Sequence, residues 1–284
     1  MIKLIAFVDG SSYSKSVCEH AAWVAGRTEA SVNIVHVLGR PSDSSKNVDL
    51  SGSIGLGART ALLEELSTLD GQMAKLSHQR GRAILEDAKA ILQSAGIKDV
   101  STQLRNEGIV EAEQSLNEQT DLIVIGKRGE GYETDEHHLG SSLERVVRAS
   151  HKPVMVASRA FKPIQKVLIA YDGGPSSQKA VNYLAANQAF NDLQCQLLCV
   201  SSASDAISSR LETAAAQLRD SGYSVETVLE QGQAEAIIIN RLQAGSFDLL
   251  VMGAYGHSRI RSLIIGSTTT SMILASKIPV LLFR

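Results

Sequence analysis

The sequence has little of what a membrane, secreted or nucleic-acid-binding protein needs. Its 284 residues carry a formal net charge of −2, so there is no broad basic surface for nucleic acid or anionic lipid. No apolar run approaches the roughly 18 residues that span a bilayer. Residues 1–9 are too short for a signal peptide and predict a strand. We therefore expect a cytoplasmic protein whose partners are small molecules or proteins, with no nucleic acid and no membrane.

Cysteine is also scarce. Cys18, Cys195 and Cys199 are an odd number in apolar surroundings, which predicts buried free thiols. On one strand, Cys195 and Cys199 would lie about 13 Å apart, too far for one metal ion. The adjacent His137 and His138 raise the alternative of a metal site, but a solvated loop is favoured because no distant ligand can be identified. We expect no metal site.

Two common catalytic signatures are missing as well. The chain contains neither the G-x-x-x-x-G-K-[ST] loop of P-loop phosphotransferases nor the G-x-S-x-G elbow of serine hydrolases. Two single residues have plain structural explanations. His36 is expected to be a strand histidine with a satisfied hydrogen bond, and Trp23 a core residue.

What the sequence does contain is a repeat on the scale of a domain. Residues 3–10 match residues 166–173 at an offset of 163, and residues 121–126 match 248–253 at an offset of 127. A third match, of residues 149–154 with 275–280, has an offset of 126. The length suits two domains of about 140 residues, and 44% apolar residues are enough for sizeable cores. We expect domains at 1–160 and 161–284.

Strands and helices alternate through the first half. Strands are predicted at 3–8, 32–37, 100–104, 122–125 and 153–157, and helices at 14–27, 84–92, 110–116 and 142–149. The second half repeats this order. Repeated alternation of this kind predicts two α/β units with parallel sheets.

The offset falls from 163 to 127, which places an insertion of about 36 residues in the first domain, at about 39–80. A narrow apolar seam with spacings of 4, 3, 4 and 3 occupies its second part: Leu62, Leu66, Leu69, Met73 and Leu76. The favoured interpretation is an extra helix packed on its own domain, and the alternative is a seam for another subunit. A glycine at position 71 argues against a long rigid coil.

The most specific pattern follows the apolar run 247–252. It reads Gly253-x-x-Gly256, nine further residues, then Gly266-Ser267 and a predicted helix. The first N–H groups of a helix have no partner inside it, and that end carries partial positive charge, so an anion is favoured there. Gly266 lets the backbone approach such an anion closely.

Side chains of the same loop add to this anion site. The hydroxyls of Ser267 and Thr268 are further donors, and His257 and Arg259 bring positive charge. No acidic residue lies between positions 253 and 270. The loop therefore predicts a phosphate-binding site.

This pattern resembles the ATP-binding signature of the universal stress protein (UspA) family, and the chain is similar to its tandem members. The resemblance implies two Rossmann-like domains, similar to adenine nucleotide α-hydrolases, each a five-stranded parallel sheet with helices on both faces. It implies ATP over the carboxyl ends of the strands, and the general rule for open α/β sheets points to the same edge. Mg²⁺ is an optional companion ion of this ATP. By the same resemblance Asp172 contacts the nucleotide and Val200 receives the adenine. The alternative for Asp172 is that it only caps the turn at 173–175.

The first domain keeps the frame of this site but not its loop. The corresponding positions are Asp9, Val37, Gly126, Gly129, Gly140 and Ser141. Ten residues rather than nine separate the last two glycines, and four of them are acidic: Glu130, Glu133, Asp135 and Glu136. Acids oppose a polyphosphate unless a divalent cation intervenes, so we expect weak ATP binding or none in this degenerate site.

These observations predict an ATP-binding tandem universal stress protein that acts in the stress response as a nucleotide-dependent sensor or regulator. No general base is evident near the γ-phosphate, so no catalytic residue is named, and slow hydrolysis stays open. One alternative is an adenine-nucleotide hydrolase, although residues 172–177 lack the order of its S-G-G-x-D-S loop. The other is a protein-interaction scaffold. A homodimer is compatible with all three, with residues 279–283 as a candidate edge strand.

Overall fold

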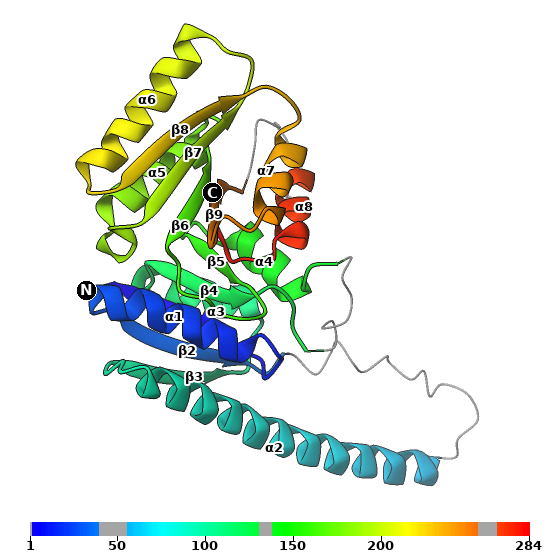
Figure 1. Cartoon of the computed structure of the whole chain (residues 1–284). Coiled ribbons are helices and arrows are strands. Elements are labelled where there is room, and N and C mark those ends of the chain that lie inside the picture. The colour runs from blue at the N-terminus through cyan, green and yellow to red at the C-terminus, as the bar shows by residue number, and fades with distance from the viewer. Residues whose placement is uncertain (1, 40–55, 131–137, 255–265) are drawn as a thin grey trace.

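The computed structural model describes residues 2–39, 56–130, 138–254 and 266–284 as a mostly parallel α/β fold (Figure 1). The elements of the first half are β1 (Lys3–Phe7), α1 (Ser14–Thr28), β2 (Ser31–Val37), α2 (Leu56–Ser94), β3 (Val100–Arg105), α3 (Ile109–Leu116), η2 (Asn117–Gln119), β4 (Leu122–Gly126), α4 (Ser141–Ala149) and β5 (Val154–Ala157). Those of the second half are β6 (Lys166–Ala170), α5 (Pro175–Ala186), η3 (Gln188–Phe190), β7 (Gln194–Val200), α6 (Asp205–Asp220), β8 (Ser224–Glu230), α7 (Ala234–Gln243), β9 (Leu249–Gly253), α8 (Ser267–Ala275) and β10 (Val280–Phe283).

All ten strands belong to one sheet, in the order β3-β2-β1-β4-β5-β10-β9-β6-β7-β8. Each half contributes five parallel strands, and the halves meet where β5 and β10 pair antiparallel. Within each half the strand order reverses between the first and fourth strands. That reversal, at β1/β4 and at β6/β9, is where open α/β sheets bind ligands.

Successive strand residues point to opposite faces of this sheet and into two cores. Leu4 and Ala6 join the cluster under α1, α2, α5 and α6, whereas Ile5 and Phe7 join the cluster under α3, α4, α7 and α8. Each cluster runs across both halves. Both faces of the sheet are therefore covered, as the continuous apolar strands predict.

The expectation that residues 279–283 form an edge for pairing with another chain is wrong. β10 lies inside the sheet, between β9 and β5, and so has a strand on either side. The same pairing answers how the two repeats sit: they share one sheet within a single chain.

Side chains reinforce the contact between the halves. Trp23 on α1 lies against Phe190 of η3, with ring centroids 5.8 Å apart. The guanidinium of Arg27 donates to the carbonyl of Ala189 at 2.6 Å. The buried Lys127 amine donates to the carbonyl oxygens of Leu274 and Ser276, at 2.7 and 3.2 Å, at the C-terminal end of α8. A cation at that end also interacts favourably with the helix dipole.

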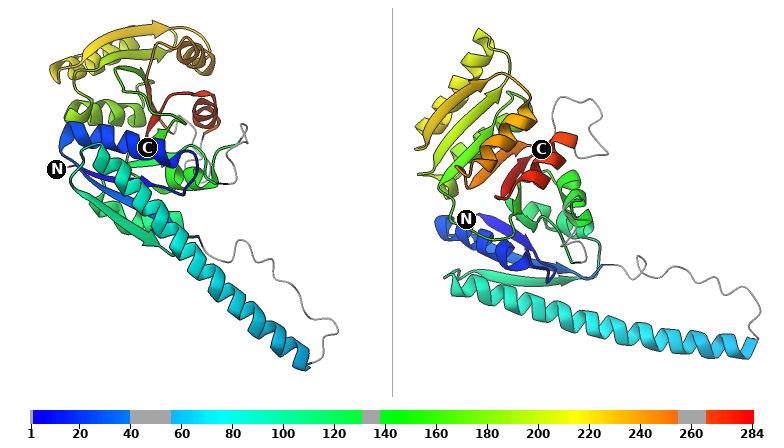
Figure 2. Two further views of the ribbon diagram at one scale, coloured as in Figure 1. Left: turned by 60° about the horizontal axis from the view of Figure 1, so that its bottom comes forward. Right: turned by 45° about the vertical axis from the view of Figure 1, so that its right-hand side comes forward.

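The insertion does not form a separate helix packed on its own domain. It extends the helix expected at 84–92 toward the N-terminus, giving α2 its span of 39 residues. Only the C-terminal part of α2 packs on the sheet, and the rest projects away from the body (Figure 2). Four residues of the predicted seam, Leu66, Leu69, Met73 and Leu76, are 42–64% exposed.

Within the described residues, no helix combines the length and the apolar character that crossing a membrane requires. The three cysteines are buried free thiols, as expected. Burial raises the pKa of Cys18 and of Cys195 to about 12, so these thiols stay protonated and unreactive in the folded protein.

Candidate functional site

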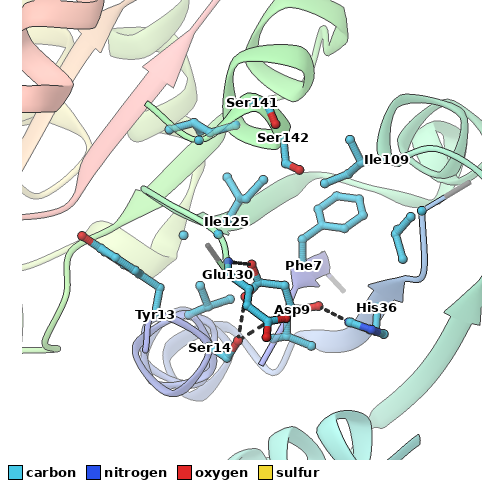
Figure 3. A pocket seen from close by; sticks show the side chains of 18 of the residues that line it. Phe7, Asp9, Tyr13, Ser14, His36, Ile109, Ile125, Glu130, Ser141 and Ser142 are labelled. Carbon is cyan, nitrogen blue, oxygen red and sulfur yellow. Dashed lines mark hydrogen bonds between the residues drawn. The ribbon is translucent and has the colours of Figure 1, made fainter. Parts of the chain in front are cut away.

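A pocket of about 570 Å³ lies at the carboxyl ends of β1 and β4, the switch point of the first half (Figure 3). All six positions of the predicted degenerate site line it: Asp9, Val37, Gly126, Gly129, Gly140 and Ser141. They come from segments far apart in the sequence. The register of the parallel strands brings them together, because strands β1, β2 and β4 all end at this edge.

Asp9 organises the wall of this pocket. Its carboxylate accepts hydrogen bonds from the Ser11 N–H at 3.0 Å, the Ser14 hydroxyl at 3.2 Å and the Glu130 N–H at 3.0 Å. A Cβ on Gly129 would lie 2.7 Å from an Asp9 carboxylate oxygen, so glycine is required there for this close approach. Asp9 thus ties the turn after β1 to the loop after β4.

The insertion helix contributes to the same pocket. Arg80 of α2 forms an ion pair with Glu130 across it. His36, which also lines the pocket, shares a 2.7 Å hydrogen bond between Nδ1 and the Val8 carbonyl oxygen, as expected for a strand histidine. Because of its ion pair with Glu130, the charge of Arg80 is directed at an acid of the loop. Glu133, Asp135 and Glu136 lie outside the described residues.

Asp172 occupies the place in the second half that Asp9 has in the first. Its carboxylate accepts hydrogen bonds from the Gly174 N–H at 2.8 Å and the Ser177 hydroxyl at 2.6 Å. It therefore caps the turn that leads into α5, the role that the sequence left as its alternative. Contact with a nucleotide stays a prediction for this residue.

The other predicted positions of the second half lie around the β6/β9 switch point. Val200 ends β7 and Gly253 ends β9. A Cβ on Gly253 would lie 2.9 Å from the Ser176 Cβ, so a side chain there would collide with the start of α5. Gly256, His257 and Arg259 lie outside the described residues.

The N-terminus of α8 is the part of the predicted loop that the structure describes. Gly266 is the N-cap, and Ser267 and Thr268 are the first two helical residues, all exposed. The next residue, Thr269, is buried and donates its hydroxyl hydrogen to the Ala254 carbonyl at 2.7 Å. This bond fixes the start of α8 against the end of β9. The first N–H groups of the helix consequently point to the carboxyl edge of the sheet.

One cation at this edge was not expected from the sequence. Arg210 of α6 approaches the turn after Asp172: a Cβ on Gly173 would lie 3.8 Å from the Arg210 Cδ. Burial raises the pKa of the neighbouring Tyr171, and the charge of Arg210 opposes that rise. In the first half Ile84 takes the corresponding place over Gly10. The repeat matches Gly10 with Gly173, and the structure places Ile84 over the first and Arg210 over the second, so these two positions correspond in space.

The metal alternative gains no support from the described residues. No group of three or more His, Cys, Asp and Glu side chains suited to an ion occurs in the part of the chain that the structure describes. His137 lies outside that part, and the carbonyl oxygen of His138 accepts a hydrogen bond from Arg128 Nε at 3.2 Å.

Comparison with known proteins agrees with this architecture. The model of the universal stress protein family matches residues 1–158 and 201–284. The chain belongs to the universal stress protein family. It is 38% identical to the universal stress protein Slr1230 of Synechocystis sp. over 288 aligned residues, which cover 100% of both chains.

Solved structures of the family share the fold of the whole chain. A universal stress protein of Archaeoglobus fulgidus superposes with a TM-score of 0.71 at 20% identity, over 99% of this chain and 98% of the other. A putative universal stress protein of Pseudomonas aeruginosa gives 0.59 at 17% identity, over 99% and 92%. The family assignment thus covers both halves, while residues 159–200, including Asp172 and Val200, lie between the two family-model matches.

Proposed function

We propose that this universal stress protein binds ATP, with Mg²⁺, at the carboxyl edge of its second half and acts in the cytoplasm as a nucleotide-dependent regulator in the stress response. The observation that carries the proposal is the start of α8. There a glycine N-cap, two exposed hydroxyl residues and the unpaired N–H groups of a helix follow a loop with the family spacing. The proposed contacts are Asp172, Val200, Gly253, Gly256, His257, Arg259, Gly266, Ser267 and Thr268.

The two halves differ in charge at their switch points, and this difference favours the second. The first pocket has Glu130 at its rim, and Arg80, the cation that α2 brings there, forms an ion pair with that acid. In the second half Arg210 approaches the turn after Asp172, and the loop sequence 253–270 contains no acid. Arg128 and Arg145 also line the first pocket, but its loop sequence adds the acids Glu133, Asp135 and Glu136, which oppose a triphosphate, whereas the second loop adds none.

Binding with slow or no turnover fits the groups at this edge. The carboxylate of Asp172 is already directed to the N–H of Gly174 and the hydroxyl of Ser177. A carboxylate engaged in this way orients a turn and is a poor base for activating water. The nucleotide would then change the shape or the partners of the protein, including its self-association, by occupying the site.

Gly266→Val tests the site with little risk to folding. Gly266 has φ −56° and ψ 142°, which any residue adopts, and among the described residues a Cβ there would meet only the Thr269 hydroxyl oxygen, at 3.8 Å. The added side chain would therefore extend into the space proposed for phosphate. Gly26→Val is the matched control, because Gly26 is exposed on α1 and a Cβ there meets only Ile97 at 3.9 Å.

Calorimetric titration with ATP and Mg²⁺ should show one site per chain, retained in Gly26→Val and lost in Gly266→Val. Equal binding by both variants would contradict the assignment to the second half. No binding by the wild type at millimolar ATP would contradict the function itself. Analysis of the products of a long incubation distinguishes three outcomes: slow hydrolysis to ADP, cleavage to AMP and pyrophosphate, and no cleavage of ATP.

A further inference from the structure

The projecting part of α2 lies outside the body of the protein. Every residue from 64 to 77 is exposed, on all sides of the helix. Both views of Figure 2 show this part extending beyond the sheet and its covering helices. At 1.5 Å per residue, these residues extend the helix by about 20 Å.

An amphipathic helix in this position lacks the packing that normally stabilises it. Isolated helices of this length are marginal in water, and most helical stability in proteins comes from burying an apolar face. Leu66, Leu69, Met73 and Leu76 form such a face at a and d spacing, yet they are 42%, 50%, 64% and 59% exposed. We call these four residues the α2 seam. None of the other described residues covers it.

The charges along α2 change sign from one end of the seam to the other. Residues 64–70 carry three acids, Glu64, Glu65 and Asp70, and residues 75–82 carry the bases Lys75 and Arg82 beside Arg80, which pairs with Glu130 of its own chain. Two parallel copies would place acid beside acid and base beside base. Two antiparallel copies bring the acidic end of one helix to the basic end of the other.

We propose that the α2 seam binds a second copy of this chain in an antiparallel two-helix coiled coil. Leu66 packs against Leu76 of the second copy, and Leu69 against Met73 of the second copy, so one two-fold axis relates all four layers. The contact is isologous and closes at a dimer. This inference is independent of the nucleotide and gives the insertion a role that the rest of the domain does not require.

Gly71 is compatible with this arrangement. It lies two residues from Leu69 and from Met73, on the side of the helix opposite the seam, and a Cβ at this position would have no atom of the described residues within 4 Å. Its cost of roughly 1 kcal/mol in helix propensity therefore does not disturb the packed face. Gly71 was expected to argue against a long rigid coil, but its place opposite the seam leaves the apolar face of α2 continuous.

Sedimentation velocity with matched charge variants tests the proposal. Leu69→Glu puts a charge into the seam, whereas Ser67→Glu puts the same charge on the opposite, exposed face of the same helix. The wild type and Ser67→Glu should sediment as dimers, less so at high salt because opposite charges are then screened. Leu69→Glu should sediment as a monomer. Its far-ultraviolet circular dichroism should show that the fold outside the projecting part of α2 is retained. A monomeric wild type, or a dimer that survives Leu69→Glu, would overturn the proposal.

Engineered cysteines test the antiparallel orientation, since the three native thiols are buried. The double variant Leu66→Cys with Leu76→Cys should form disulfide-linked dimers under mild oxidation. Leu66→Cys alone should remain unlinked, because its counterpart in the second copy is Leu76. Efficient linkage of the single variant would show parallel helices and contradict the proposed pairing.

Discussion

Truncating Phe190 should destabilise both halves of the protein together. This side chain is 0% exposed and belongs to the core cluster that spans the halves. It packs on Trp23 of the first half at 5.8 Å and on Tyr183 of the second at 6.4 Å, both between ring centroids. Arg27 lies over the Trp23 ring and donates to the η3 backbone, and Tyr183 also packs against Phe283, so neither neighbour can collapse freely. Phe190→Ala should therefore leave a cavity and cost about 3–5 kcal/mol.

Urea denaturation with two probes measures this cost. Trp23 is the single tryptophan, so its fluorescence reports the contact between the halves, while far-ultraviolet circular dichroism reports all helices. Both transitions should move together to lower urea. The control Phe190→Leu keeps a branched apolar side chain and should cost less than about 2 kcal/mol. A loss below about 1 kcal/mol for Phe190→Ala, or a fluorescence transition that moves alone, would show that Phe190 does not couple the two halves.

Three further predictions concern buried polar groups. Lys127→Met removes the amine from two carbonyls at the end of α8 and should cost roughly 1–3 kcal/mol in urea denaturation; an unchanged midpoint would contradict this. Burial lowers the pKa of His20 despite its backbone hydrogen bond to Ser16, so the unfolded state binds the extra proton. The free energy of unfolding should therefore fall as pH drops below about 6.5, by at most ~1.4 kcal/mol per pH unit, and this part of the slope should vanish in His20→Gln. With pKa values raised to about 12, Cys18 and Cys195 should react with a disulfide reagent at pH 8 only on unfolding, and immediate reaction would show that they are accessible.

The sequence predicted the order of elements because short apolar strand segments alternate along it with longer segments of helical periodicity. The continuous apolar strands and the repeat at 166–173 left one consistent arrangement, and helix starts such as Ser14 agree with the structure. The six positions of the first pocket were also predicted, because residues that end parallel strands must meet at one edge. The ligands of these sites remain proposals.

The misses share a physical cause: contacts between distant segments leave no local pattern. A short apolar strand such as β10 reads the same at an edge or inside a sheet, so its pairing with β5 was not foreseen. The seam of α2 predicted a helix correctly, but periodicity does not say what covers an apolar face. Arg210 reaches the site from a helix whose sequence shows no motif, and its correspondence to Ile84 is visible only in the structure.

Hydrogen exchange measured with and without ATP and Mg²⁺ compares both candidate nucleotide sites in one intact chain. We expect slower exchange at residues 253–270 and at the turn after β6, with no change at residues 126–142. Protection at residues 126–142 alone would place the nucleotide in the first pocket and contradict binding in the second half.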